Sequence, residues 1–158
     1  MRKCRVMLPV ALKVALLGTV GLLLVGTVSR AQAPAPEVVV YKTASCGCCT
    51  HWIDHMRANG FRVTSHDVAD INRVKSEHGV PSEAASCHTA IVNDYVVEGH
   101  VPADAVQRLL RERPDVSGIA VPGMPAGSPG MEVPGGRRDA YSIVTFDENG
   151  QISLFEQR

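Results

Sequence analysis

Three cysteines lie within four positions of the chain, between a strand-like segment and a helix-like segment. The stretch reads "KTASCGCCTHW" and contains Cys46, Cys48 and Cys49. The preceding residues, 38–42, are β-branched and apolar, which favours a buried strand. From 47 to 59 apolar residues recur at spacings of three and four, as in a helix with one buried face. The sequence therefore predicts that the cysteines lie where a strand passes into a helix.

The order of the other predicted elements indicates an α/β fold. A strand at 61–68, a helix at 70–78, hairpin strands at 89–92 and 95–100 and a helix at 102–113 follow the cysteines. This β-α-β-α-β-β-α order is that of the thioredoxin-like fold, although several other α/β folds share it.

The part of the chain after residue 117 has a different composition. In the segment 118–136, ten of nineteen residues are Gly or Pro, so a loop packed against the domain is predicted. The segments 141–146 and 151–157, on either side of "DENG", then predict a C-terminal β-hairpin.

The first 33 residues have the pattern of a secretory signal peptide. Arg2, Lys3 and Arg5 precede an uncharged run at 14–28, and "AQA" at 31–33 is a small-x-small cleavage pattern. The alternative is an uncleaved membrane anchor, but fifteen residues fall short of the roughly 20 that a spanning helix needs. We expect residues 1–33 to be removed on export and residues 34–158 to form one domain in an oxidising compartment. Cys4 precedes the uncharged run and is left out of the chemistry.

Composition excludes several other classes of function. The 158 residues have a net charge of zero and no basic patch, so nothing indicates a nucleic acid partner. The sequence contains no carboxylate pair placed for hydrolysis, no phosphate-binding glycine loop and no Ser-His-Asp set. No catalytic residues are therefore assigned.

Cys46 and Cys49 form a C-x-x-C pair at the predicted helix start. Residues three apart lie on the same side of a helix, and a helix N-terminus stabilises thiolates. Such thiolates attack disulfides or ligate metals, and the spacing does not decide between the two. In a regular helix Cys48 would point away from Cys46. It joins the same site only if the first turn is irregular or if the site accommodates more than one metal ion.

A second motif, "SCHTAIV", supplies further candidate ligands. In thioredoxin-like folds a proline before the facing strand contacts the C-x-x-C pair. Aligning residues 89–92 with that strand puts His88 at the proline position and Cys87 just before it. We therefore expect Cys87 and His88 to meet the cysteine cluster.

Two methionines and two histidines remain open as ligands. Met124 and Met131 lie in the Gly/Pro-rich loop, and thioether sulfur suits Cu(I) but rarely zinc. The alternative for both methionines is core filling. His51 either reaches the cluster or faces solvent. His100, in "EGHVP", is either a structural hydrogen-bonding group or an outer ligand.

Several separated motifs together resemble one family. "SCGCC", "SCHTA", "VEGHVPA" and "GIAVPGMPAGSPGME" are similar, in this order, to motifs of the periplasmic copper-resistance proteins called CopG, long catalogued as a metal-binding domain of unknown function. The resemblance covers roughly residue 38 to the C-terminus. It implies a thioredoxin-like fold, a periplasmic location and redox-active copper bound through the C-x-C-C cysteines. The ligands carried over are Cys46, Cys48, Cys49 and Cys87, then His88, with Met124 and Met131 matching the loop motif.

The sequence thus favours an exported copper-binding protein for copper tolerance. Clustered thiolates can bridge several Cu(I) ions, so a multinuclear site would account for the third cysteine. The protein would sequester Cu(I), or cycle copper between oxidation states for an exporter or a periplasmic redox partner. This cycling would be a copper oxidoreductase activity. No membrane contact beyond the signal segment is expected.

Two other functions remain open. In a thiol-disulfide oxidoreductase, Cys46 would be the nucleophile and Cys49 the resolving thiol. In a structural zinc domain, the ligands would be Cys46, Cys49, Cys87 and His88. The zinc site leaves Cys48 and both loop methionines unexplained.

Overall fold

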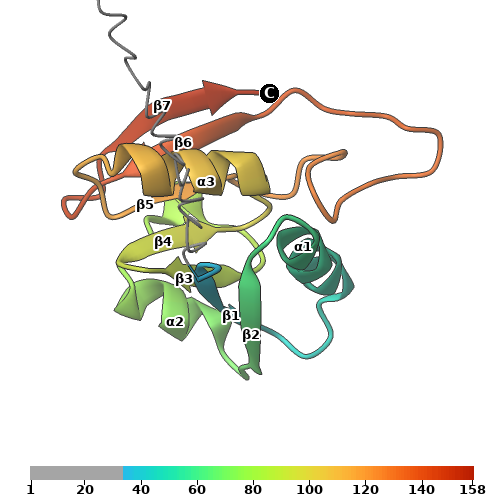
Figure 1. The fold of residues 1–158 in the computed structure, drawn as a ribbon, viewed down its shortest axis with the longest axis horizontal. Coiled ribbons are helices and arrows are strands. Elements are labelled where there is room, and N and C mark those ends of the chain that lie inside the picture. Colours follow the sequence, from blue (N-terminus) through green and yellow to red (C-terminus); the bar gives the residue numbers. More distant parts are fainter. Residues whose placement is uncertain (1–33) are drawn as a thin grey trace, which may run out of the picture. The chain divides into compact units, whose positions relative to one another are not determined.

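Seven strands form one mixed sheet in the computed structural model, which describes residues 34–158 (Figure 1). The strands are β1 (Glu37–Lys42), β2 (Arg62–Asp67), β3 (Thr89–Val92), β4 (Tyr95–Glu98), β5 (Gly118–Ala120), β6 (Ser142–Phe146) and β7 (Ile152–Gln157). The helices are α1 (Gly47–Ala58), α2 (Ile71–Glu77), α3 (Ala103–Glu112) and a short 3-10 turn, Ser82–Ala84. The predicted signal peptide lies outside the described residues.

The first four strands confirm the predicted thioredoxin-like arrangement. Their order in the sheet is β2-β1-β3-β4, with β1 parallel to β2 and antiparallel to β3. β3 and β4 form an antiparallel hairpin in which Thr89 lies opposite Glu98 and Val92 opposite Tyr95. A two-residue turn, Asn93-Asp94, joins them, and Asn93 adopts the positive φ that such turns need.

The sheet separates two apolar cores. On one face α1 contributes Trp52, Ile53 and Met56, and α3 contributes Val106 and Leu109, to the larger core. The smaller cluster lies on the other face, around buried Ala84, Val96, Ala120 and Phe146. α2 contacts β1 and β3. Aliphatic side chains alternate between the two faces along β3 and β4, because successive residues of a strand point to opposite sides.

The prediction of a loop at 118–136 was wrong at its first three residues. Gly118–Ala120 forms β5, which pairs in parallel with β4 and antiparallel with β6. A Cβ at Gly118 would collide with the Val96 carbonyl oxygen, so glycine permits this close approach. Through β5 the predicted C-terminal hairpin, β6 and β7, joins the main sheet. Residues 121–136 contain no helix or strand, as predicted.

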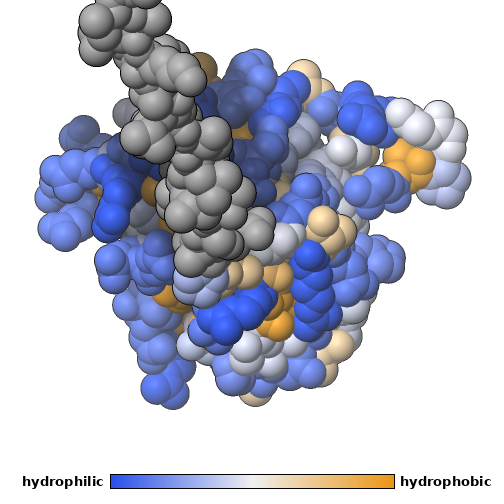
Figure 2. Space-filling model, in the orientation of Figure 1, coloured by the Kyte–Doolittle hydropathy of each residue, from blue (hydrophilic) through white to orange (hydrophobic). Residues whose placement is uncertain are grey.

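Hydrophilic side chains cover most of the visible part of the face in Figure 2, and the hydrophobic patches on it are small and separate. Among residues 34–158, the exposed large hydrophobic side chains are Met124, Ile152 and Leu154. No helix in this part of the chain is both long and apolar enough to cross a membrane.

Candidate metal centre

Cys46 lies just outside helix α1, and this brings its sulfur close to that of Cys48. α1 begins at Gly47, and Cys46 is its N-cap with an extended backbone, φ −77° and ψ 93°. The two side chains therefore do not follow helical spacing, and Cys46 Sγ lies 3.5 Å from Cys48 Sγ. The extended backbone at Cys46, just outside the helix, thus lets the side chains of Cys46 and Cys48 meet.

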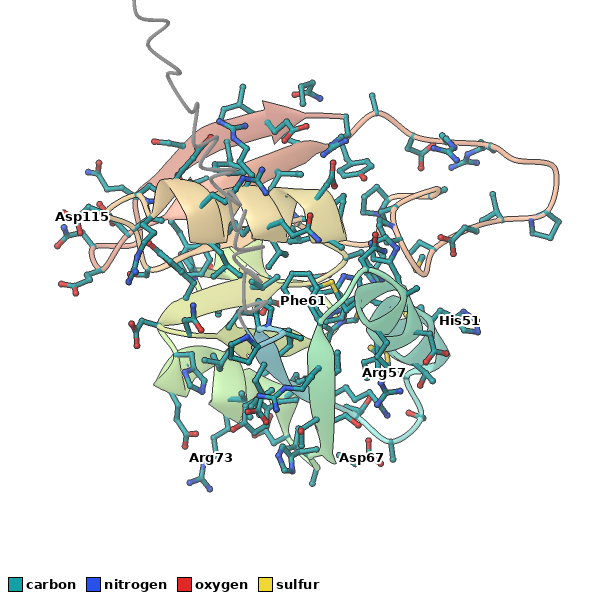
Figure 3. The ribbon with its side chains drawn as sticks, in the orientation of Figure 1. His51, Arg57, Phe61, Asp67, Arg73 and Asp115 are labelled. Carbon is teal, nitrogen blue, oxygen red and sulfur yellow. A yellow bond between two sulfur atoms is a disulfide. The ribbon has the colours of Figure 1, made fainter. Side chains whose placement is uncertain are left out.

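Cys46 and Cys49 are joined by a disulfide, whereas Cys48 and Cys87 are free thiols. Cys49 is buried and the two free cysteines are half-buried. Sulfur atoms beside α1 are visible in yellow in Figure 3. In this oxidised state two of the four sulfurs are available as thiolates, and reduction makes all four available.

Folding brings Cys87 from the segment before β3 to the cysteines of α1. Cys87 Sγ lies 3.5 Å from Cys49 Sγ and 4.0 Å from Cys48 Sγ. The four sulfurs all lie within 4.8 Å of one another. The expected juxtaposition of Cys87 and the C-x-C-C cysteines is therefore present in the structure.

The environment of Cys87 keeps its thiol protonated when no metal is bound. Burial, followed by the nearby Cys48 sulfur, raises the pKa of Cys87 to about 12. A soft cation that bound this thiolate would displace the proton, so metal binding there would be coupled to proton release.

His88 lies against the cysteines with its ring buried. Its Nδ1 is 3.3 Å from Cys87 Sγ, and its ring lies over Trp52 with 4.5 Å between centroids. Trp52 is held in turn by donating from Nε1 to the Val101 carbonyl oxygen. Burial lowers the pKa of His88 well below its usual value, so the ring is neutral. His88 Nε2 is the only buried side-chain N or O in the described residues that lacks a hydrogen-bond partner.

His100 has the geometry of a metal ligand held by an outer hydrogen bond. Its Nδ1 lies 2.8 Å from the Pro129 carbonyl oxygen, which only accepts, so Nδ1 carries the proton. The other nitrogen, Nε2, then presents a lone pair 3.0 Å from Cys87 Sγ. Ligating histidines are commonly oriented in this way through their second nitrogen. Burial also lowers the pKa of His100.

Hairpin register could have placed His100 at the site from the sequence. In a hairpin with the two-residue turn Asn93-Asp94, residue 92 lies opposite 95 and residue 89 opposite 98. Two further steps put residue 87 opposite residue 100. His100 stays open as a ligand in the sequence because its partner in this register, Cys87, lies before the predicted strand at 89–92.

The Gly/Pro-rich loop docks beside the cysteines through its backbone. A Cβ at Gly130 would lie 2.7 Å from both the Cys48 carbonyl oxygen and the Trp52 amide nitrogen. Gly123 bonds to the segment just before Cys87, because its N–H donates to the Ala85 carbonyl oxygen. Met124 follows Gly123 and is 55% exposed, and Met131 is half-buried. The loop thus lies against the site, and its two thioethers are at or near the surface.

Two other histidines of α1 lie outside the cluster. His51 is exposed and points outward (Figure 3). His55 is half-buried, and its Nε2 accepts a hydrogen bond from the Ala103 backbone N–H at 3.1 Å. The sequence did not show this contact because α3 begins 48 residues later in the chain.

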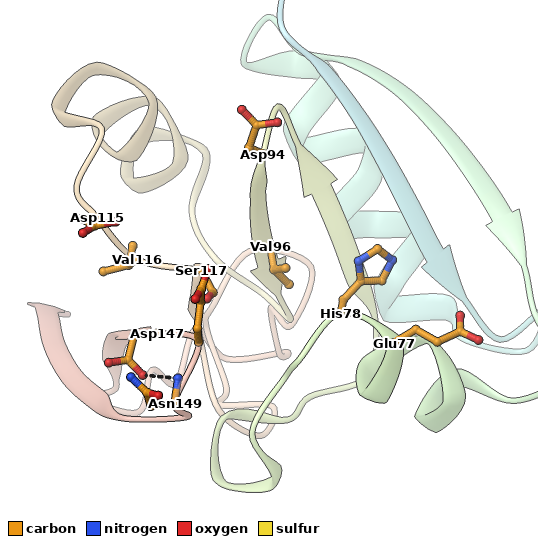
Figure 4. A pocket seen from close by; sticks show the side chains of 10 residues that line it. Glu77, His78, Asp94, Val96, Asp115, Val116, Ser117, Asp147 and Asn149 are labelled. Carbon is orange, nitrogen blue, oxygen red and sulfur yellow. Dashed lines mark hydrogen bonds between the residues drawn. The ribbon is translucent and has the colours of Figure 1, made fainter.

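A large pocket lies away from the cysteines (Figure 4). Its volume is about 520 Å³ and most of its side chains are acidic or polar. No cysteine or methionine lines it, so it offers no soft ligand. Its lining residues are Glu77, His78, Asp94, Val96, Asp115, Val116, Ser117, Asp147, Glu148 and Asn149.

Fold and site together define a thioredoxin-like protein with a cluster of four cysteines and two adjoining histidines. Residues 84–131 match the model of a family described as protein of unknown function, DUF411. Two solved structures of copper resistance protein CopG, form 1 and form 2, are each 50% identical to this chain with a TM-score of 0.74. They cover 80% and 78% of this chain, respectively, and the match covers 98% of each CopG chain. The chain therefore belongs to the CopG family. A comparison with curated protein sequences found no significant match.

Proposed function

We propose that this protein is exported and binds several Cu(I) ions through Cys46, Cys48, Cys49 and Cys87 as part of copper tolerance. The observation that carries the proposal is the convergence of the four sulfurs within 4.8 Å of one another. A thiolate can bridge two Cu(I) ions, so this many sulfurs in so small a volume suits a multinuclear site better than a single tetrahedral ion. The CopG proteins that it resembles are described as copper resistance proteins.

His88 and His100 would complete the site on the side of Cys87. With Cys87 they form a second group of donors whose ligand atoms lie within 4.8 Å of one another. Both imidazoles are neutral, which is the state that ligates a metal. Met124 and Met131 would be outer ligands, and the exposed Met124 would be the first soft donor met by an incoming ion. Soft sulfur donors with imidazole favour copper over harder divalent ions.

The disulfide between Cys46 and Cys49 supports a redox role for the same site. Two thiolates that join as a disulfide release two electrons, which reduce two Cu(II) ions to Cu(I). The reverse step, in which two Cu(I) ions are oxidised, returns the two thiolates. In this way the protein would adjust the oxidation state of copper for an exporter or a redox partner in the periplasm.

Anaerobic titration of the fully reduced full-length chain with Cu(I), in competition with a coloured chelator, tests the proposal. We expect more than one tightly held Cu(I) per chain, and fewer in the disulfide form, because two sulfurs are then withdrawn. Cys48→Ser and Cys87→Ser should each reduce the number or the affinity of bound ions. His66→Gln, at an exposed residue of β2, is the control and should not change either. Binding of less than one Cu(I) per wild-type chain would contradict the proposal.

The same disulfide favours thiol-disulfide exchange as the second candidate function. The pair lies at the start of a helix in a thioredoxin-like fold, where dithiol enzymes carry their redox centre. An insulin-reduction assay of metal-free protein separates the two functions. Turnover that survives Cys87→Ser would support a dithiol enzyme, because that chemistry needs only Cys46 and Cys49. Analysis of the metal bound to protein purified after growth with zinc or with copper separates both of these functions from a structural zinc site.

A further inference from the structure

A charged pair is buried under the cysteine site, on the face of the sheet opposite α1. Glu98 of β4 is fully buried and Lys75 of α2 is 6% exposed. The lysine Nζ donates to Glu98 Oε1 and, at 3.2 Å, to Thr89 Oγ1. Neither charged residue belongs to the proposed copper site, and neither makes another ion pair within the described residues.

A buried ion pair of this kind is a poor means of stabilising a fold. Removing two charges from water can cost more than their attraction returns, and replacing such a pair by well-packed apolar residues of similar size is often neutral or stabilising. The presence of this pair therefore calls for a role that apolar side chains cannot fill.

The contacts of Glu98 indicate that role, because they lie on both sides of Cys87 and His88. Oε1 accepts a hydrogen bond from the Ser86 backbone N–H at 2.6 Å. Oε2 accepts one from Thr89 Oγ1 at 2.8 Å. One carboxylate thus holds the residue before Cys87 and the residue after His88.

The segment that Glu98 holds has only a few other contacts through its backbone, one of them the Ala85 carbonyl oxygen that accepts from the Gly123 N–H. Residues 85–88 are outside the helices and strands, and the ladder of β3 begins at Thr89. Gly99, the residue after Glu98, donates its N–H to the His88 carbonyl oxygen at 3.0 Å. The Ser86 hydroxyl donates to the Gly123 carbonyl oxygen. Among these contacts, only those of Glu98 involve a charged group. Hydrogen bonds with an ionised partner are stronger than those between neutral groups, so Glu98 ties the segment to the interior of the sheet.

We propose that Glu98 is a positioning residue that holds Cys87 against the other three sulfurs, with Lys75 balancing its charge. The role of Glu98 in copper binding rests on the proposed function, whereas its role in positioning Cys87 does not. A carboxylate suits this place because it offers two acceptor oxygens to donors from Ser86, Thr89 and Lys75. It approaches the site from the opposite face and acts through its contacts with the Ser86 N–H and the Thr89 hydroxyl, not by touching the sulfurs.

Two double variants of the full chain test the proposal as a matched pair. Both Glu98→Gln/Lys75→Met and Glu98→Leu/Lys75→Met remove the charges. Only the first keeps a side-chain oxygen to accept from the Ser86 N–H. The first measurement is alkylation of the disulfide form without metal, in which Cys48 and Cys87 are the free thiols of the site. Peptide masses give the rate at Cys87 relative to Cys48, and a general loss of stability would raise both rates together.

We expect the leucine variant to raise the relative alkylation rate of Cys87 by about tenfold, because a buried N–H loses its partner. The glutamine variant should raise it by no more than about threefold, because that partner is kept. A wild-type rate in the leucine variant, or equal rates in both variants, would overturn the proposal. Should the leucine variant not fold, Glu98→Asp takes its place. This substitution keeps the charge but shortens the reach to Ser86, and an unchanged Cys87 rate would again overturn the proposal.

Cu(I) affinity of the reduced protein is the second measurement. The leucine variant should bind Cu(I) more weakly by about tenfold, and the glutamine variant should lie close to wild type. If wild-type protein itself binds no Cu(I), the proposed function fails, whereas the alkylation rates still decide whether Glu98 holds Cys87.

Discussion

Gly130 occupies the point at which the Gly/Pro-rich loop meets the first turn of α1. Its φ is +83°, a conformation that side chains with a Cβ rarely adopt. There is also no room for a Cβ between the Cys48 carbonyl oxygen and the Trp52 amide. The next loop residue back, Pro129, holds His100 through its carbonyl oxygen. Two adjacent loop residues therefore need a fixed backbone position, Gly130 against α1 and Pro129 against His100.

Gly130→Ala should weaken both folding and copper binding. The left-handed backbone alone costs an alanine about 1–2 kcal/mol, and the collision with α1 adds to this cost. The loop must move, so Pro129 no longer orients His100. Chemical unfolding and Cu(I) competition measure the two effects.

The control for this prediction is Gly135→Ala. Gly135 has nearly the same φ, +85°, but a Cβ there would meet nothing within 4 Å. It should show the backbone cost without the loss of copper affinity. Equal copper affinities in the two variants would show that the loop does not support the site.

Helix α2 is short, but it carries the lysine that pairs with buried Glu98 of the sheet. It has only seven residues, so its stability depends on its cap and on tertiary packing. Asp70 caps the helix by accepting hydrogen bonds from the N–H groups of Asn72 and Arg73. One turn further along, the helix carries Lys75, the partner of Glu98.

Asp70→Ala should lower the free energy of unfolding by about 1 kcal/mol, the usual cost of losing a side-chain N-cap. Asp70→Asn should retain most of this stability, because asparagine also accepts from the N–H groups at the helix start. Urea unfolding of the three proteins makes the comparison. A loss as large in Asp70→Asn as in Asp70→Ala would show that the cap is not what the aspartate contributes.

Over the whole molecule, packing of α3 against α1 contributes to how stability responds to pH. His55 of α1 is half-buried where it accepts from Ala103 of α3. Burial lowers the pKa of His55 below the ordinary 6.5, and this outweighs Glu132 and Asp104, which act to raise it. The folded protein therefore binds fewer protons at His55 than the unfolded chain does. The stability that His55 contributes is present above pH 6.5 and is lost as the pH falls below that value.

We expect metal-free protein to be easier to unfold at pH 5 than at pH 7.5, and His55→Gln to reduce this difference. Glutamine does not titrate and can still accept from the Ala103 N–H. Unfolding curves at the two pH values measure the change. His66→Gln, on the exposed edge strand, should leave the pH dependence as in wild type. An undiminished pH dependence in His55→Gln would rule out His55 as a source.

Local sequence patterns were sufficient to predict most of the helices and strands and to predict where the cysteines of the site lie. Apolar spacing predicted α1 and β1, and the Cys46–Cys49 spacing placed a dithiol at their junction. The alignment of "SCHTAIV" with the facing strand predicted that Cys87 and His88 meet that junction. These features follow from the sequence because each depends on residues near one another in the chain or on the regular register of a fold.

Tertiary structure alone decided the features that depend on contacts between distant residues. β5 was missed because a three-residue strand has no periodicity to detect, and it is its pairing with β4 and β6 that makes it a strand. The tautomer of His100 depends on the Pro129 carbonyl, 29 residues away. Nothing in the sequence pairs Glu98 with Lys75, which lies 23 residues earlier. They are buried because a sheet strand and a helix on its far face bring opposite charges together out of water.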